Sequence, residues 1–151
     1  DSLADLLQIK LRERLRQDLG ATYGVGVSIN PTHYPRETYA LRIDFGSAPE
    51  RATELQKAVF DEIDRVKTHG ASDAELQKVR ETDLRERETN LKQNRVWLSL
   101  LASYDFNGWD PALILKYDQV VKALDSAKMQ AAARKYFDSS RYVVVQLLPA
   151  H

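Results

Sequence analysis

The chain has 151 residues, with 22 basic and 22 acidic side chains, so its formal net charge at pH 7 is zero. This length suits one domain with a buried core, and a hydrophobic fraction of 43% is ordinary for a globular protein. A balanced charge gives no electrostatic attraction to nucleic acid or to an anionic membrane. The sequence contains no cysteine, which excludes disulfides, thiol nucleophiles and cysteine-held iron–sulfur clusters.

Targeting and membrane signals are not visible in the sequence. No apolar run reaches the roughly 18–20 residues that a membrane-spanning helix needs, so we expect no membrane insertion. The chain begins at Asp1 rather than Met and opens directly on an amphipathic segment. This start favours a mature protein or an excised piece of a longer one.

The first third of the chain predicts a helix followed by a β-hairpin. Leucines recur at helical spacing over residues 3–19, and Gly20 follows as a C-cap. Residues 23–29 and 39–45 each alternate apolar side chains with small or polar ones, which is typical of strands. The loop that begins at Asn30 makes a hairpin the simplest connection between them.

Two helices with recognisable start signals should follow the hairpin. Ser47 and the Ala-Pro-Glu that follows it are typical of a helix start, with an apolar stripe running on to Gly70. Ser72 and Glu75 form a second capping-box pattern. From there we expect one long, highly charged helix to about Tyr104.

The last third predicts two shorter helices and a final strand. Asp110 and Asp125 are candidate N-caps, and residues 142–148 form an apolar run typical of a buried strand. The order α-β-β-α-α-α-α-β predicts a single α+β domain over residues 1–151, with an antiparallel sheet covered on one face by several helices. Three strands under five helices make a thin sheet, so we also expect one or more strands to be missing before Asp1.

The chain shows few candidates for independent catalysis. His33, His69 and His151 are far apart, so no histidine pair could hold zinc. Glycines 24 and 26 lie inside a strand rather than between a strand and a helix, which excludes a nucleotide-binding loop. Arginines at 80–95 alternate with acidic residues, which indicates a solvated helix with ion pairs rather than a nucleic-acid surface. Four aromatic residues are interpreted as packing within or between domains: Tyr39, Trp97, Tyr104 and Trp109.

One segment, residues 15–25, carries a functional motif. Leu15 and Arg16 end the first helix, and Tyr23 opens the first strand seven residues after Arg16, across Gly20. This pattern resembles a signature of the pitrilysin-type (inverzincin) zinc metallopeptidases, in which a Leu-Arg pair, a turn and a Tyr recur in the domain that faces the zinc site. On the residues alone, Arg16 would pair with a carboxylate and Tyr23 would fill the core.

The resemblance extends over essentially the whole chain. It includes the hairpin, the two capped helices, residues 94–98, residues 123–125 and the Leu148–Pro149 ending. The H-x-x-E-H zinc motif of the family is absent. The chain therefore resembles the C-terminal, zinc-free domain of a bacterial zinc protease of this type, a half-domain with a fold like LuxS and the mitochondrial processing peptidase.

The resemblance implies a substrate-binding role within a larger zinc-dependent endopeptidase. This domain would close the proteolytic chamber, while zinc and the general-base Glu would lie on another domain of the same polypeptide or on a partner subunit. Tyr23 would donate its phenol hydroxyl to the tetrahedral oxyanion, and Arg16 would bind a carbonyl of the peptide substrate. The chain itself would hold no cofactor or metal and would be inactive alone. The resemblance favours the periplasm over the cytoplasm.

Two alternatives remain open at this stage. The chain could be a non-catalytic, structural or substrate-presenting member of the same peptidase fold. It could also be an unrelated α+β binding module in which the Arg16–Tyr23 motif arose by chance.

Overall fold

The structure is a computed structural model that describes residues 2–18 and 24–147, with residues 16–18 as backbone only. The described residues confirm the α+β class, with helices and an antiparallel sheet of two strands. In chain order they form α1 (Ser2–Arg12), the π-helical turn η1 (Glu13–Asp18), β1 (Val25–Thr32), β2 (Thr38–Phe45), the 3-10 turn η2 (Pro49–Arg51), α2 (Ala52–His69), α3 (Asp73–Leu91), α4 (Asn94–Phe106), the 3-10 helix η3 (Pro111–Lys116), α5 (Tyr117–Lys122) and α6 (Ser126–Tyr136).

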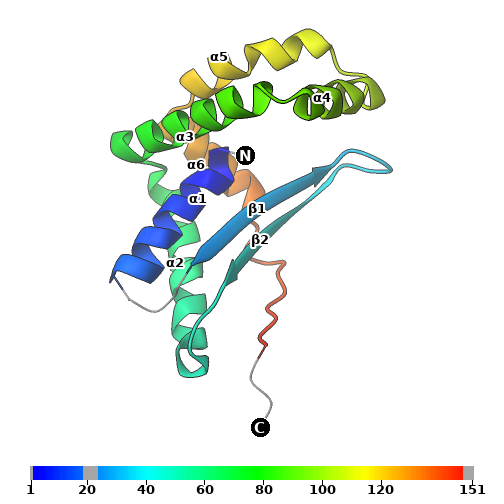
Figure 1. The fold of residues 1–151 in the computed structure, drawn as a ribbon. Coiled ribbons are helices and arrows are strands. Elements are labelled where there is room, and N and C mark those ends of the chain that lie inside the picture. The colour runs from blue at the N-terminus through cyan, green and yellow to red at the C-terminus, as the bar shows by residue number, and fades with distance from the viewer. Residues whose placement is uncertain (1, 19–23, 148–151) are drawn as a thin grey trace.

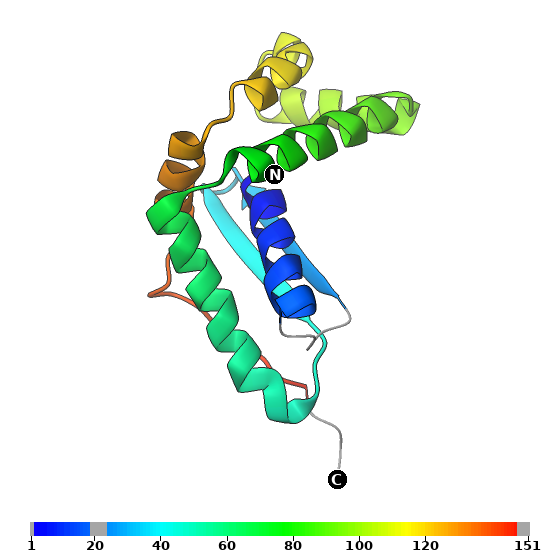
Figure 2. The ribbon, with the colours of Figure 1, turned by 90° about the vertical axis from the view of Figure 1, so that its left-hand side faces the viewer.

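The predicted hairpin is confirmed, and one of its faces packs on helices. β1 pairs antiparallel with β2, and the register places Val27 opposite Ile43 and Ile29 opposite Leu41. These four side chains point to the same face and pack against the core. α1 lies along that face, with α2 beside it (Figures 1 and 2).

The core is centred on α1. Leu6, Leu7 and Leu11 are fully buried, and the stripe continues into η1 at Leu15. They meet Leu55 and other apolar residues of α2, together with residues of α3 and α6. Burying one leucine contributes roughly 1.5–3 kcal/mol, so this stripe is a major source of stability.

Side-chain caps explain the starts of α3, η3 and α6. The Ser72 hydroxyl accepts a hydrogen bond from the Glu75 backbone N–H at 3.3 Å, and the Ser72 N–H donates to Glu75 Oε2 at 2.7 Å, as predicted for a capping box. Asp110 and Asp125 also cap as expected. The expected cap at Ser47 is wrong, because η2 starts after Ala48 and no side chain caps it.

The long charged helix predicted from Ser72 to Tyr104 is instead two helices. α3 ends at Leu91 and α4 begins at Asn94. The Trp97 indole N–H donates to the Leu91 carbonyl at 2.8 Å, and so satisfies a backbone oxygen that the helix end leaves free. No glycine or proline marks this break, which is why the sequence pattern did not reveal it.

The final buried strand predicted at residues 142–148 is wrong for the part that the structure describes. Residues 142–147 take no strand conformation, and Val143 and Leu147 are 87% and 95% exposed. Apolar β-branched residues favour a strand only where a neighbouring strand pairs with the backbone. The described sheet contains only β1 and β2, and it does not pair with this segment.

Two carboxyl groups meet where α1 crosses α3. The Ser2 hydroxyl donates to Asp83 Oδ2 at 2.5 Å. Burial raises the pKa of Asp5 to about 6, and the charge and hydrogen bond of neighbouring Asp83 act in the same direction. Asp5 therefore retains its proton in the folded chain at pH values where an unfolded carboxyl, with a pKa of about 4, has lost it.

We expect Asp5→Asn to stabilise the chain at neutral pH. A raised carboxyl pKa means that the folded state binds more protons, so wild-type stability falls as pH rises from about 4 to about 6. Because Asp5 is only half-buried, we expect a gain of about 1 kcal/mol at pH 7. Urea denaturation between pH 4 and pH 8 should show the gap between variant and wild type closing towards pH 4. A constant gap across this range would contradict the raised pKa of Asp5.

Candidate functional site

The motif segment, residues 15–25, runs between two buried anchors. Leu15 is buried in η1 and Val25 is buried at the start of β1. The backbone of Arg16 is part of η1. The Arg16 side chain and the whole of Tyr23 lie outside the described residues, so their predicted orientation towards a groove stays a prediction.

The π-helical form of η1 was not predicted. A helix with i→i+5 hydrogen bonds is rare, usually lasts a single turn, and is frequent at functional sites. The wider π-helical turn η1 includes Arg16. The sequence pattern predicted an ordinary helix through residue 19, because leucine spacing does not distinguish a widened last turn from a regular one.

Side chains from neighbouring elements contact the start and the end of this segment. The Val27 backbone N–H donates to Gln8 Oε1 at 3.2 Å, which ties β1 to α1. Lys78 on α3 forms an ion pair with Glu13 of η1 at 2.8 Å. The Gln8 hydrogen bond therefore ties the strand start to α1, whereas the exposed Glu13–Lys78 pair adds little to the stability of the helix end.

A charged triad joins α1, α2 and α3 beside the leucine stripe. Lys10 Nζ lies 3.2 Å from Glu62 Oε1 and 2.7 Å from Glu75 Oε1, and Glu62 is buried. Burial alone would lower the pKa of Lys10, but the hydrogen bond and charge of Glu75, with those of Glu62, raise it overall above its usual value. The ammonium therefore stays charged and holds three helices together.

Replacing Lys10 by Met should destabilise the chain strongly. The change keeps an unbranched side chain of similar length but leaves Glu62 with Arg65 as its remaining ion-pair partner, at 3.3 Å. We expect the free energy of unfolding to fall by about 2–3 kcal/mol, because an incompletely paired buried carboxylate is costly.

The matched control is Lys57→Met, which breaks the exposed Lys57–Asp61 pair on α2. An exposed pair contributes little, so this variant should unfold like wild type in urea. If the two substitutions lowered the free energy of unfolding equally, the triad would stabilise the chain no more than an exposed ion pair does.

The described residues do not fit a zinc site. His33 pairs with Glu37, with 3.0 Å between Nδ1 and Oε1, and its ring faces Tyr34 and Trp109. His69 lies at the end of α2, and residues 2–18 and 24–147 contain no cluster of three or more His, Cys, Asp or Glu side chains suited to a metal. In the same part of the chain, no helix is both long and apolar enough to cross a membrane.

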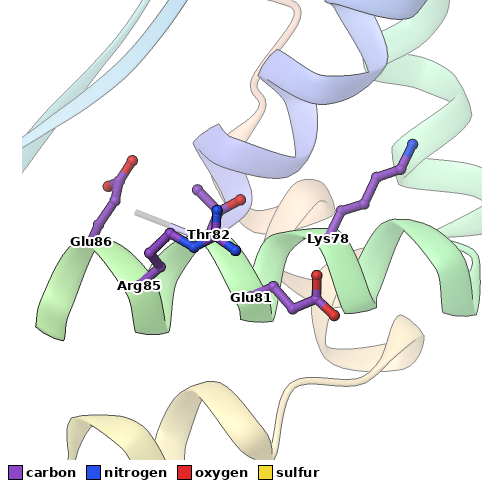
Figure 3. Close-up of a pocket in the computed structure, with 5 residues that line it drawn as sticks. All are labelled: Lys78, Glu81, Thr82, Arg85 and Glu86. Atoms are coloured by element: carbon purple, nitrogen blue, oxygen red, sulfur yellow. The ribbon is translucent and has the colours of Figure 1, made fainter.

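A shallow hollow on α3 is also a weak candidate for a binding site. Its lining, drawn in Figure 3, comes entirely from α3: Lys78, Glu81, Thr82, Arg85 and Glu86. Positive and negative side chains alternate there, and no second element contributes a group that converges on them. Small-molecule sites are usually concave and mostly apolar, so this hollow is better described as a solvated helix face.

Two arginines of α3 have structural roles that sequence patterning missed. Arg80 donates to the Leu124 carbonyl and Arg87 donates to the Ile114 carbonyl. Arg87 also pairs with Asp118 at 2.8 Å. Rather than only forming ion pairs along their own helix, as predicted, these side chains fix η3 and the end of α5 against α3.

Comparison with known protein families identifies the class of this domain. Residues 1–82 match the family model described as the peptidase M16 inactive domain, and this match covers more than half of the chain. The chain therefore belongs to the peptidase M16 inactive-domain family. The predicted resemblance to the zinc-free domain of a metallopeptidase is confirmed at the level of the family.

Solved structures support the same fold. The periplasmic protease PqqL from Escherichia coli is 19% identical, with a TM-score of 0.71, over 90% of this chain and 15% of its own. A protease from Helicobacter pylori is 20% identical, with a TM-score of 0.74, over 92% of this chain and 35% of its own. A peptidase M16 inactive domain from Pseudomonas fluorescens is 18% identical, with a TM-score of 0.74, over 89% of this chain and 33% of its own.

At these identities the likeness shows the fold alone. The chain spans at most 35% of the length of these three structures. A comparison with curated proteins finds no match.

Proposed function

We propose that this chain is the zinc-free, substrate-binding domain of a zinc-dependent endopeptidase and that it closes the proteolytic chamber. The observation that carries the proposal is the match of residues 1–82 to a peptidase M16 inactive domain. That range contains the whole motif from Leu15 to Val25. The chain's small share of the related proteases supports a role as one part of a larger enzyme.

In this proposal the chain supplies hydrogen-bond donors rather than a metal. Zinc and the general base belong to another domain of the polypeptide or to a partner subunit, where the metal would activate water and polarise the scissile carbonyl. Tyr23 donates its phenol hydroxyl to the oxyanion of the tetrahedral intermediate. Arg16 donates its guanidinium N–H groups to a nearby carbonyl of the substrate.

Stabilising an oxyanion in this way requires donors whose positions are fixed before the reaction. The buried anchors Leu15 and Val25 support such preorganisation at the two ends of the motif. The substrate would be a peptide. A periplasmic location is supported by the periplasmic relative.

A second candidate is a non-catalytic member of the same fold that presents the substrate or supports the assembly. The family description as an inactive domain favours it. Under this alternative, Arg16 and Tyr23 would contribute to packing and ion pairing rather than to turnover. Kinetics of the complete enzyme distinguish the two.

The decisive variant is Tyr23→Phe in the longer polypeptide or assembly that carries the zinc domain. Loss of an oxyanion donor should lower kcat by roughly 10²–10³ and change KM much less, because the hydrogen bond forms chiefly in the transition state. In the 151-residue chain the same change should alter the free energy of unfolding by less than about 0.5 kcal/mol. Unaltered turnover of the Tyr23→Phe enzyme would favour the non-catalytic alternative.

The 151-residue chain alone should neither hold zinc stoichiometrically nor cleave peptides. Its histidines are unpaired in sequence and it has no cysteine. The measurement is metal content after dialysis against zinc, followed by incubation with a mixed peptide library. One tightly held zinc per chain, or cleavage that a chelator abolishes, would overturn the assignment of zinc to another domain.

A further inference from the structure

Among the long helices in the described part of the chain, α4 is the least buried, although its sequence is apolar. It contains Trp97, Leu98, Leu100, Leu101, Tyr104 and Phe106, yet none of its residues is buried. Its neighbours α3 and η3 lie against one side only, where Trp97, Leu100 and Tyr104 are half-buried. In Figure 1, α4 lies at the outer end of an arm formed with α3 and α5, away from the core around α1.

The exposed side of α4 carries a continuous apolar stripe. Leu98, Leu101, Ala102 and Phe106 recur at helical spacing and all are exposed, Leu98 by 70% and Phe106 by 71%. The ring of Tyr34, from the turn between β1 and β2, packs edge-on against Phe106, with 5.5 Å between the ring centroids. The turn therefore extends the apolar surface beyond the helix itself.

Two opposite charges lie on the same side of the helix, near its ends. Arg95 lies in the first turn of α4 and Asp105 in the last. Both are exposed, and within the described residues neither side chain forms an ion pair. They are separated by ten residues, or about 15 Å of helix.

If two copies of α4 pack antiparallel, Arg95 and Asp105 can pair with each other, and no other protein is needed. When a second copy of the helix runs in the opposite direction, Arg95 of each copy lies opposite Asp105 of the other, so two equivalent ion pairs form. The twofold axis then falls at the level of residue 100, next to the exposed Leu101. Ala102, with Ser99 and Ser103 nearby, is small enough to let the helix axes approach to about 8–10 Å.

We propose that α4 is a self-association surface, on which a second copy of this chain docks through antiparallel α4 helices. Leu98, Leu101 and Phe106 are buried in the contact, and Arg95 pairs with Asp105 across it. The zero net charge of the chain adds no general repulsion between copies. The proposal is independent of the peptidase role, since Arg16 and Tyr23 take no part in it.

A second exposed apolar segment, residues 142–147, lacks this complementarity. It is Tyr-Val-Val-Val-Gln-Leu and has no charged side chain to select a partner or an orientation. Association through residues 142–147 would not depend on the charges of α4. The experiment below therefore changes the charges at Arg95 and Asp105.

Sedimentation equilibrium of the 151-residue chain should show a monomer–dimer equilibrium in the micromolar range, because a contact built on one helix is at the small end of specific interfaces. Arg95→Asp and Asp105→Arg should each weaken the dimer at least about tenfold, since every dimer then contains two like-charge pairs.

Mixing the two variants should restore dimers. The Arg95→Asp chain is acidic at both positions and the Asp105→Arg chain is basic at both, so each pair across the mixed dimer joins opposite charges. The double variant Arg95→Asp/Asp105→Arg should also dimerise.

A matched pair of apolar variants separates this contact from general stickiness. Leu98→Glu should abolish the dimer, whereas Leu115→Glu should not, although Leu115 in η3 is 69% exposed. Circular dichroism should show an unchanged helix content in every variant, because all the positions are exposed. A chain that stays monomeric up to about 1 mM, dimers that persist in both single charge variants, or a failure of mixing to restore them would each overturn the proposal.

Discussion

The structure depends on the burial of one face of α1. Its leucines fill the space between the β1–β2 hairpin on one side and α2, α3 and α6 on the other. At the edge of that apolar contact, Lys10 joins the same helix to Glu62 on α2 and Glu75 on α3. Because α1 leads directly into η1, the contacts that fix α1 also position the start of the motif segment.

Sequence patterns correctly predicted the elements that depend mainly on neighbouring residues in the chain. The hairpin followed from alternation in residues 23–29 and 39–45, and the start of α3 followed from Ser72 and Glu75. The errors have a common physical origin. The break after Leu91 depends on a contact from Trp97, and a strand at residues 142–147 would need a pairing edge that the described sheet does not offer. Propensity cannot reveal contacts that only the tertiary arrangement supplies.

The candidate site was predictable only in part, for a related reason. The family resemblance alone assigned a functional role to Arg16 and Tyr23. Without it, the residue types and their spacing predict an ion pair for Arg16 and a packed ring for Tyr23. The supports around them, Gln8 on Val27 and Lys78 on Glu13, join residues 19 and 65 positions apart. No pattern in a single sequence identifies such pairs, although they connect residues on either side of the motif to the rest of the domain.

The same division between a fixed centre and an outer arm explains why the two proposals do not compete. Arg80 and Arg87 attach the segments from Ile114 to Leu124 to α3, and the Trp97–Leu91 hydrogen bond sets where α4 leaves that helix. Trp97 lies on the inner side of α4, and the apolar stripe of this helix faces outward. The proposed donors Arg16 and Tyr23 lie outside α4 in the sequence, so the proposed substrate role and the proposed association through α4 involve different residues.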